Sequence, residues 1–200
     1  MQIGILGTGT LATALAQGWS EAGHALVVGG RDSSKARTLA ERFGGGAVPP
    51  RDVAGDAVLL AVRHDGVEPM LAAAGDLAGV PLIDPTNAVE HGVGELLTPP
   101  GASIAGRIAA LTGAHVVKAF HLYPAAQWTE RPEPVVVPLC GDDAAALGTV
   151  ATLVRDVGGE PAVVGGLARA RQLEETAGLV IALAFAGADP RKAIPSVARE

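Results

Sequence analysis

The sequence predicts an α/β protein of the Rossmann type, with a doubly wound, mostly parallel sheet and a small C-terminal α/β extension. Two observations carry this prediction. Short apolar runs alternate with helical patterns along the 200 residues, as in chains built from strand–helix–strand units. In addition, the apolar run Ile3–Leu6 leads into Gly7, Gly9 and Ala12 at G-x-G-x-x-A spacing, directly before a helical pattern.

The turn after this first strand has the pattern of a dinucleotide-binding site. Gly7 lets the chain reverse tightly, Gly9 leaves its backbone open to a pyrophosphate, and Ala12 allows the helix to pack close to the strand. The start of the following helix offers unpaired N–H groups and a partial positive charge to phosphates. We therefore expect Gly7 and Gly9 to bind a dinucleotide.

Composition excludes several other classes of protein. The net charge is −6 without a basic run, so nucleic acid is not an expected partner. The single cysteine, Cys140, rules out an internal disulfide framework and fits a reducing cytoplasm. The apolar stretch 177–188 is too short to span a bilayer, so we expect a cytoplasmic protein that does not enter the membrane. No metal site is predicted.

The remaining elements follow from the same patterns. Leu11, Leu15 and Trp19 share one face of a first helix predicted over 10–22, and Gly23 ends it. Further strands are predicted at 25–28, 47–48, 56–62, 80–84, 114–120, 135–140 and 160–164. Further helices are predicted at 33–43, 66–77, 103–111, 141–157 and 167–186, whereas 91–101 and 121–128 are predicted as loops. We expect an NADP-binding domain over 1–140 and a small C-terminal portion over 141–200 that completes the substrate pocket.

The tip of the second strand indicates which dinucleotide binds. An NAD site commonly has an acidic residue there, which accepts hydrogen bonds from the ribose hydroxyls. This chain has Arg31 at the tip, with Ser33 and Lys35 behind it, and Asp32 is predicted to cap the next helix. An arginine fork and an ammonium group suit a 2′-phosphate, so these residues favour NADP over NAD. The alternative is a solvated helix start with ordinary surface charges.

Polar residues follow later strands at the edge of the sheet where ligands bind in open α/β folds. Asn87 either contacts a ribose or an amide or belongs to an ordinary turn, and His64 either contacts the adenosine half or faces water. Lys118 lies in an apolar strand and is expected either to pair with an acid, with Glu174 and Glu175 as candidates, or to point out at an edge.

Six stretches together resemble the family of NADP-dependent oxidoreductases that use coenzyme F420. They are 3–12, 30–35, 82–87, 116–120, 139–143 and 165–174, and the resemblance covers nearly the whole chain. It implies reversible hydride transfer between NADPH and an 8-hydroxy-5-deazaflavin, with the two rings stacked at the C-terminal edge of the sheet. The corresponding cofactor-binding residues would be Thr8, Gly9, Thr10, Leu11, Arg31, Ser33 or Ser34, Lys35, Val62, Asn87 and Ala119.

The chain departs from the family pattern in two places. Arg63 stands where a proline is common, and Phe120 is followed by His121-Leu122-Tyr123 where the family typically has Asn-Thr. The second departure lies beside the expected hydride-transfer site. Hydride transfer between two such rings needs positioning more than acid catalysis, whereas reduction of a ketone or imine needs a proton source.

Three functions remain open on these grounds: a deazaflavin reductase, a reductase of a small ketone or imine, and a non-catalytic NADP-binding module. His121 is the candidate catalytic residue, followed by Tyr123, because histidine titrates near neutrality; the alternative is a loop histidine with satisfied hydrogen bonds. The apolar last helix further predicts a homodimer.

Overall fold

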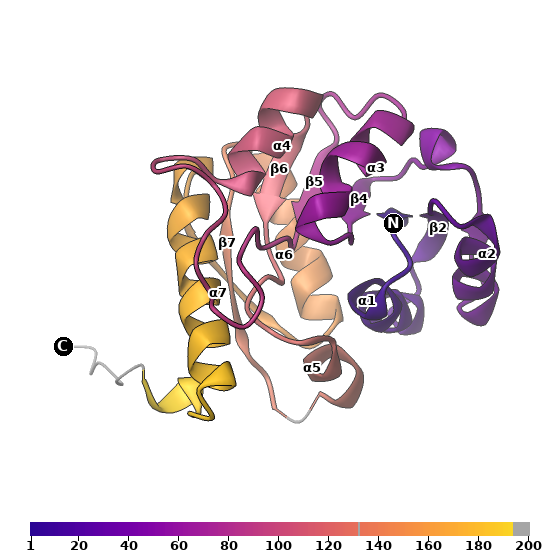
Figure 1. Ribbon diagram of the computed structural model, residues 1–200. Helices are drawn as coiled ribbons and strands as arrows, with labels where there is room; N and C mark the ends of the chain where they lie inside the picture. The colour runs from indigo at the N-terminus through magenta and orange to yellow at the C-terminus, as the bar shows by residue number, and fades with distance from the viewer. Residues whose placement is uncertain (132, 194–200) are drawn as a thin grey trace.

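The computed structural model describes residues 1–131 and 133–193, and these form one eight-stranded sheet with helices on both faces (Figure 1). The strands are β1 (Gln2–Leu6), β2 (Ala25–Gly29), β3 (Gly46–Ala47), β4 (Ala57–Leu60), β5 (Pro81–Asp84), β6 (His115–Lys118), β7 (Val136–Cys140) and β8 (Glu160–Gly165). Their order is β3-β2-β1-β4-β5-β6-β7-β8, and all neighbours are parallel except β6 and β7. The predicted fold class is confirmed.

Helices cover the sheet in two layers. The α-helices are α1 (Thr10–Glu21), α2 (Ser33–Arg42), α3 (Val67–Ala73), α4 (Ile104–Thr112), α5 (Ala125–Glu130), α6 (Ala144–Asp156) and α7 (Ala170–Phe185). Short 3₁₀ turns lie at Pro50–Asp52, His64–Gly66, Leu167–Arg169 and Pro190–Lys192. One apolar cluster joins α1, α2, α5 and α6 to one face of the sheet, and a second joins α3, α4 and the start of α7 to the other.

The strands read as continuous apolar runs because most of them are covered on both faces. β1, β4 and β5 are almost entirely buried, with Ile3, Ile5, Leu59 and Ile83 fully inaccessible to solvent. The helix α1 packs close to them because alanine and glycine make up most of its buried positions; Ala12 is completely buried. This packing carries out the role predicted for Ala12.

Several boundaries differ from the sequence prediction, and three of the differences have a clear local cause. β6 ends at Lys118 instead of residue 120 because Phe120 adopts a left-handed backbone conformation, with φ 61°, which ends a strand. β4 ends at Leu60 instead of residue 62, where the chain turns into the 3₁₀ segment that precedes α3. The second half of the predicted loop 121–128 belongs to α5 because Trp128 anchors this helix in the core beside Phe120, with ring centroids 5.1 Å apart.

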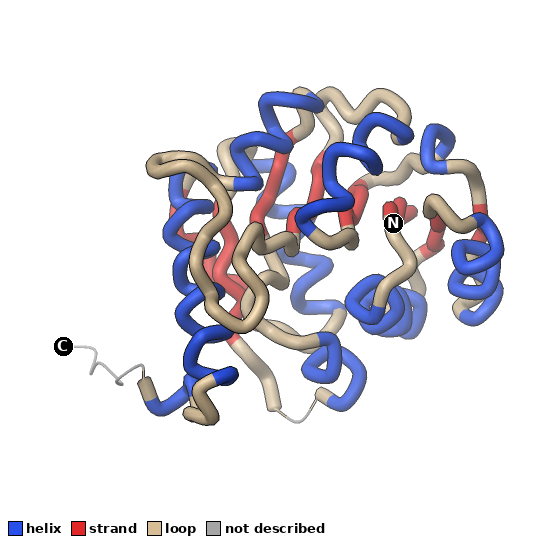
Figure 2. The backbone as a smooth tube through the Cα atoms, in the orientation of Figure 1, coloured by secondary structure: helices blue, strands red, loops and turns tan. Residues whose placement is uncertain are grey.

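The C-terminal part continues the sheet. β7 and β8 extend it beyond β6, α6 covers β5 and β6, and α7 packs against α4. The domain division at residue 140 stays a prediction, and the strands pair across it. The predicted loop of 91–101 contains part of a small hairpin, closed by a bridge between Val89 and Leu96, and this segment lies along α7 (Figure 2). In the described ranges no helix is long and apolar enough to cross a membrane.

Candidate functional site

The glycine turn lies at the point where the strand order reverses. β2 and β3 extend the sheet from one side of β1, and β4 and β5 extend it from the other, which opens a crevice at the carboxyl ends of β1 and β4. Gly7 holds this turn with φ 125°, and its N–H donates to the Gly29 carbonyl at 2.9 Å. A Cβ on Gly7 would collide with the Ala61 carbonyl, so only glycine fits there.

Gly9 has a different role from Gly7. It is the N-cap residue of α1 in an ordinary extended conformation, and no side chain caps the helix. A Cβ on Gly9 would meet no atom within 4 Å, so the space in front of the helix start is open. The 12-residue helix therefore presents unpaired N–H groups to an open space, which is the arrangement that binds a pyrophosphate.

A cavity of about 460 Å³ adjoins this helix start, and we call it the glycine-turn cavity. Its walls include Gly7, Thr8, Gly9, Gly30, Arg31, Asp32, Lys35, Ala61, Val62, Arg63 and Met70. The structure thus brings together residues from the first turn, the tip of β2 and the end of β4. Of the predicted cofactor-binding residues near the turn, Ser33, Thr10 and Leu11 do not line this cavity.

The charges at the tip of β2 fit a phosphate. The Asp32 carboxylate accepts hydrogen bonds from the N–H groups of Ser34 and Lys35 at 3.0 and 3.2 Å and from the Ser34 hydroxyl at 2.6 Å. These bonds, the Ser34 hydroxyl first, hold the pKa of the Asp32 carboxyl below its usual value. Asp32 therefore serves as the predicted helix cap. Arg31 and Lys35 are exposed beside it.

A second cavity of about 460 Å³ continues from the first and is called here the Asn87 cavity. It is lined by Val62, Arg63, His64, Pro85, Thr86, Asn87, Val89, Glu90, His91, Leu97 and Ile181. Val62 and Arg63 line both cavities, so the two meet at the end of β4. Val89 and Ile181 are a wall that the sequence patterns did not predict, because the hairpin and α7 come together only in the folded chain.

Buried polar groups near this cavity have unused hydrogen-bonding capacity. The Asn87 Nδ2 donates to the His121 carbonyl at 2.7 Å, which ties the loop after β5 to the loop after β6. The Thr86 Oγ1, the Asn87 Oδ1 and both ring nitrogens of His121 are buried without a partner among the described residues. Such atoms are costly in a folded protein unless a ligand or water satisfies them. Ala119, also predicted here, is completely buried and lines neither cavity.

His121 does not have the titration behaviour expected from the sequence. Its side chain is almost completely buried, and burial, aided by the charge of Lys118, lowers the pKa of the imidazole to about 3. At neutral pH the ring is therefore uncharged, which corrects the expectation of a group that titrates near neutrality. Tyr123 is directed elsewhere: its hydroxyl donates to the Val136 carbonyl at 3.1 Å, and its ring packs on Trp128.

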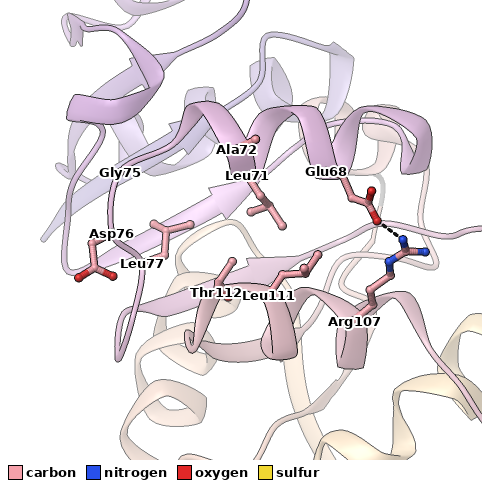
Figure 3. A pocket seen from close by; sticks show the side chains of 9 residues that line it. All are labelled: Glu68, Leu71, Ala72, Gly75, Asp76, Leu77, Arg107, Leu111 and Thr112. Carbon is pink, nitrogen blue, oxygen red and sulfur yellow. Dashed lines mark ion pairs between the residues drawn. The ribbon is translucent and has the colours of Figure 1, made fainter.

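The largest hollow that we describe lies on another part of the surface. It has a volume of about 510 Å³ and lies between α3 and α4, with an ion pair of Arg107 and Glu68 at one end (Figure 3). Gly75 and Leu77 at its other end precede β5, so it opens toward the amino ends of the strands. Ligands of open α/β sheets bind at the opposite edge. In the described ranges no group of three or more His, Cys, Asp or Glu side chains is placed to hold a metal ion.

A doubly wound sheet with a glycine turn at the reversal point defines the Rossmann class of nucleotide-binding folds. Within this class, residues 2–88 match the family described as "NADP oxidoreductase coenzyme F420-dependent". This match covers the first part of the chain and agrees with the family that the sequence resembles.

Individual proteins are similar to this chain over most of its length. Metalloreductase STEAP3 of Rattus norvegicus is 29% identical over 178 residues, which is 86% of this chain and 36% of that protein, so the chain spans about a third of that relative. A hypothetical protein from Sinorhizobium meliloti is 27% identical with a TM-score of 0.74, over 85% of this chain and 87% of that one.

Two further solved structures show the same fold. A protein provisionally described as an F420-dependent NADP reductase from Arthrobacter sp. FB24 is 24% identical with a TM-score of 0.80, over 94% of this chain and 96% of that one. The reductive aminase from Aspergillus terreus in complex with NADPH is 23% identical with a TM-score of 0.70. The match covers 93% of this chain and 63% of the aminase.

Proposed function

We propose that this protein transfers a hydride between NADP(H) and a deazaflavin of the coenzyme F420 type. The main support for this proposal is the presence of two neighbouring cavities of equal volume, which share Val62 and Arg63 in their walls. The glycine-turn cavity has the groups that a 2′-phosphate and a pyrophosphate need, and the Asn87 cavity leaves room beside it for two rings. The family match supports this proposal, and so does the description of the Arthrobacter protein.

The residues that would hold NADP(H) are the start of α1 for the pyrophosphate, and Arg31 and Lys35 for the 2′-phosphate. Val62, Asn87 and the backbone near Ala119 would hold the nicotinamide end. The cofactor supplies the hydride, and the protein contributes orientation and the exclusion of water. Val62, Pro85 and Ile181 give the Asn87 cavity apolar walls against which flat rings can stack.

The state of His121 favours a deazaflavin over a ketone. Ketone reduction needs a proton as the hydride arrives, and an imidazole with a pKa of about 3 carries no extra proton at neutral pH. Tyr123, the second candidate donor, is hydrogen-bonded to Val136 and lines neither cavity. His64 and His91 line the Asn87 cavity, on the 3₁₀ turn after β4 and on the hairpin. His121 also lines neither cavity, and it acts through its backbone carbonyl, which accepts the hydrogen bond of Asn87.

The direct test mixes the purified protein with NADPH and oxidised coenzyme F420 and follows the visible absorbance of the deazaflavin. We expect bleaching that depends on the protein and is stoichiometric with NADPH consumed. A panel of cyclic imines and small ketones is assayed in parallel with the same enzyme. Turnover of an imine or ketone without any bleaching of the deazaflavin would exclude this proposal, and tight NADPH binding without turnover of any acceptor would favour the non-catalytic module.

A further inference from the structure

Three charged side chains are completely buried next to Thr86, a residue that lines the Asn87 cavity. Lys118, the last residue of β6, places its Nζ 3.0 Å from the Asp84 Oδ2 and 3.2 Å from the Glu174 Oε1. Asp84 is the last residue of β5, and Glu174 lies in the second turn of α7. All three side chains are inaccessible to solvent. Only one of the two sequence candidates is therefore a partner of Lys118, because Glu175 pairs with Arg171 at the surface.

The negative charges of this cluster are satisfied by backbone groups as well as by the lysine. Glu174 accepts hydrogen bonds from the N–H groups of Ile104 and Ala105, at 3.1 and 3.3 Å, in the first turn of α4. A carboxylate is favourable there because the start of a helix carries partial positive charge. The other oxygen of Asp84 accepts from the Thr86 N–H at 2.8 Å. The cluster thus joins β5, β6, α4 and α7.

The same cluster fixes the polar wall of the Asn87 cavity. The Lys118 ammonium donates to the Thr86 carbonyl, and Asp84 holds the Thr86 N–H, so both backbone groups of this residue are engaged. The next residue, Asn87, is bonded to the His121 carbonyl. On the other wall, Ile181 lies seven residues after Glu174 in α7, which is about two helical turns and the same side of the helix.

We propose that Lys118, Asp84 and Glu174 form a positioning cluster that holds Thr86, Asn87 and His121 against the α7 wall in the geometry that hydride transfer requires. This inference rests on the proposed function. Thr86 and Asn87 line the cavity and make contact with a ligand there, His121 holds Asn87 through its backbone carbonyl, and the three buried charged residues act through them. The charge of Lys118 also favours the uncharged form of His121.

Stability alone is a poor explanation for this cluster. Buried ion pairs are often no more stabilising than apolar side chains of similar volume, because the charges lose their hydration. What a buried ion pair does provide is a defined orientation, since each partner has strict hydrogen-bonding requirements. An ion pair next to the cavity can therefore fix the orientation of the residues that line it, and small displacements of such residues lower the rate of the reaction.

The experiment compares Glu174→Gln with Glu175→Gln, which makes the same chemical change one residue further along α7. Glu174→Gln leaves Lys118 paired with Asp84 and keeps an amide oxygen for the start of α4, so folding is expected. We expect its NADPH dissociation constant to stay within threefold of the wild type, because none of the three cluster residues lines the glycine-turn cavity. We expect kcat with coenzyme F420 to fall at least tenfold, and Glu175→Gln to keep wild-type values for both.

A second readout does not depend on the acceptor. The fluorescence lifetime and anisotropy of bound NADPH report how firmly the nicotinamide is held, and both are expected to fall in Glu174→Gln alone. A wild type that does not reduce coenzyme F420 would refute the proposed function, while the fluorescence comparison would still test the cluster. The double variant Lys118→Met, Glu174→Gln keeps the net charge of the cluster and is expected to show a larger effect than the single variant.

The positioning role is overturned if Glu174→Gln matches Glu175→Gln in kcat and in the fluorescence of bound NADPH. It is also overturned if Glu174→Gln weakens NADPH binding in proportion to kcat, since that pattern indicates general loosening of the fold. All measurements are made well below the melting temperature of each variant.

Discussion

Replacing Arg31 by alanine tests whether the tip of β2 selects NADP over NAD. Arg31 is exposed beside the glycine-turn cavity, and the neighbouring Asp32 is engaged as a helix cap. A hydrogen bond to a charged group contributes about 1.5–3 kcal/mol, and the exposure of Arg31 places the expected loss near the lower value. About 1.5 kcal/mol corresponds to roughly tenfold weaker NADPH binding.

The assay titrates the protein with NADPH and with NADH at fixed ionic strength and follows the fluorescence of the bound nicotinamide. We expect Arg31→Ala to weaken NADPH binding about tenfold and to leave NADH binding nearly unchanged, because NADH has no 2′-phosphate. Lys35→Ala is expected to have a smaller effect in the same direction, about two- to fivefold, because its ammonium is an exposed point charge 3.9 Å from the Asp32 carboxylate.

Arg37→Ala is the matched control for this series. Arg37 is an exposed residue of the same helix α2 and lines neither cavity, so its loss changes net charge by the same amount. Equal weakening of NADPH binding in Arg31→Ala and Arg37→Ala would refute a specific phosphate contact and indicate only a long-range charge effect. Equal weakening of NADPH and NADH binding would place Arg31 at another part of the dinucleotide.

Four further outcomes are expected. Gly9→Ala should keep the wild-type melting temperature and lose NADPH affinity, whereas Gly7→Ala should lose about 1–3 kcal/mol or more of unfolding free energy from its strained backbone alone, measured by urea denaturation. Asp32→Ala should lower the melting temperature without creating a preference for NADH. Because folding lowers the pKa of Asp32, the stabilisation by its carboxylate is present above the unfolded-state pKa and is lost as the pH falls through the folded-state pKa. The melting temperatures of wild type and variant should therefore converge in acid. His121→Asn should show the same inflections between pH 5 and 8 as the wild type in kcat against pH, because the His121 imidazole titrates near pH 3; loss of an inflection would contradict its neutral state. The predicted homodimer is tested by sedimentation of the wild type and of Leu179→Glu, a half-exposed position of α7, with a shift of the variant to the monomer mass as the expected result.

Local patterns were sufficient for the first half of the candidate site. The residues Gly7, Gly9 and Ala12 lie within six positions of one another, so their spacing in the sequence predicts the shape of the turn directly. The cap by Asp32 is equally local, since its carboxylate bonds to residues two and three positions later. The family match over 2–88 includes these short-range motifs.

Patterns were less informative about the second half of the site. The helix α5 depends on the packing of Trp128 against Phe120 and Tyr123. It has only six residues, which is too few for a helical pattern of apolar residues to predict it. The protonation of His121 depends on burial and on a lysine three residues away, which are properties of the folded state. The residue type alone therefore suggested that His121 donates a proton, whereas its burial and the nearby Lys118 keep the imidazole uncharged.

The sequence by itself determined the Rossmann fold, the glycine turn and the cationic tip at Arg31, because each depends on residues that are neighbours along the chain. Only the tertiary structure decided that Lys118 pairs with Asp84 and Glu174, that the Asn87 cavity is closed by the hairpin and α7, and that His121 is uncharged. The physical reason is distance along the chain. Residues separated by 32 or more positions meet at this site, and which of them meet is set by how the helices pack on the sheet.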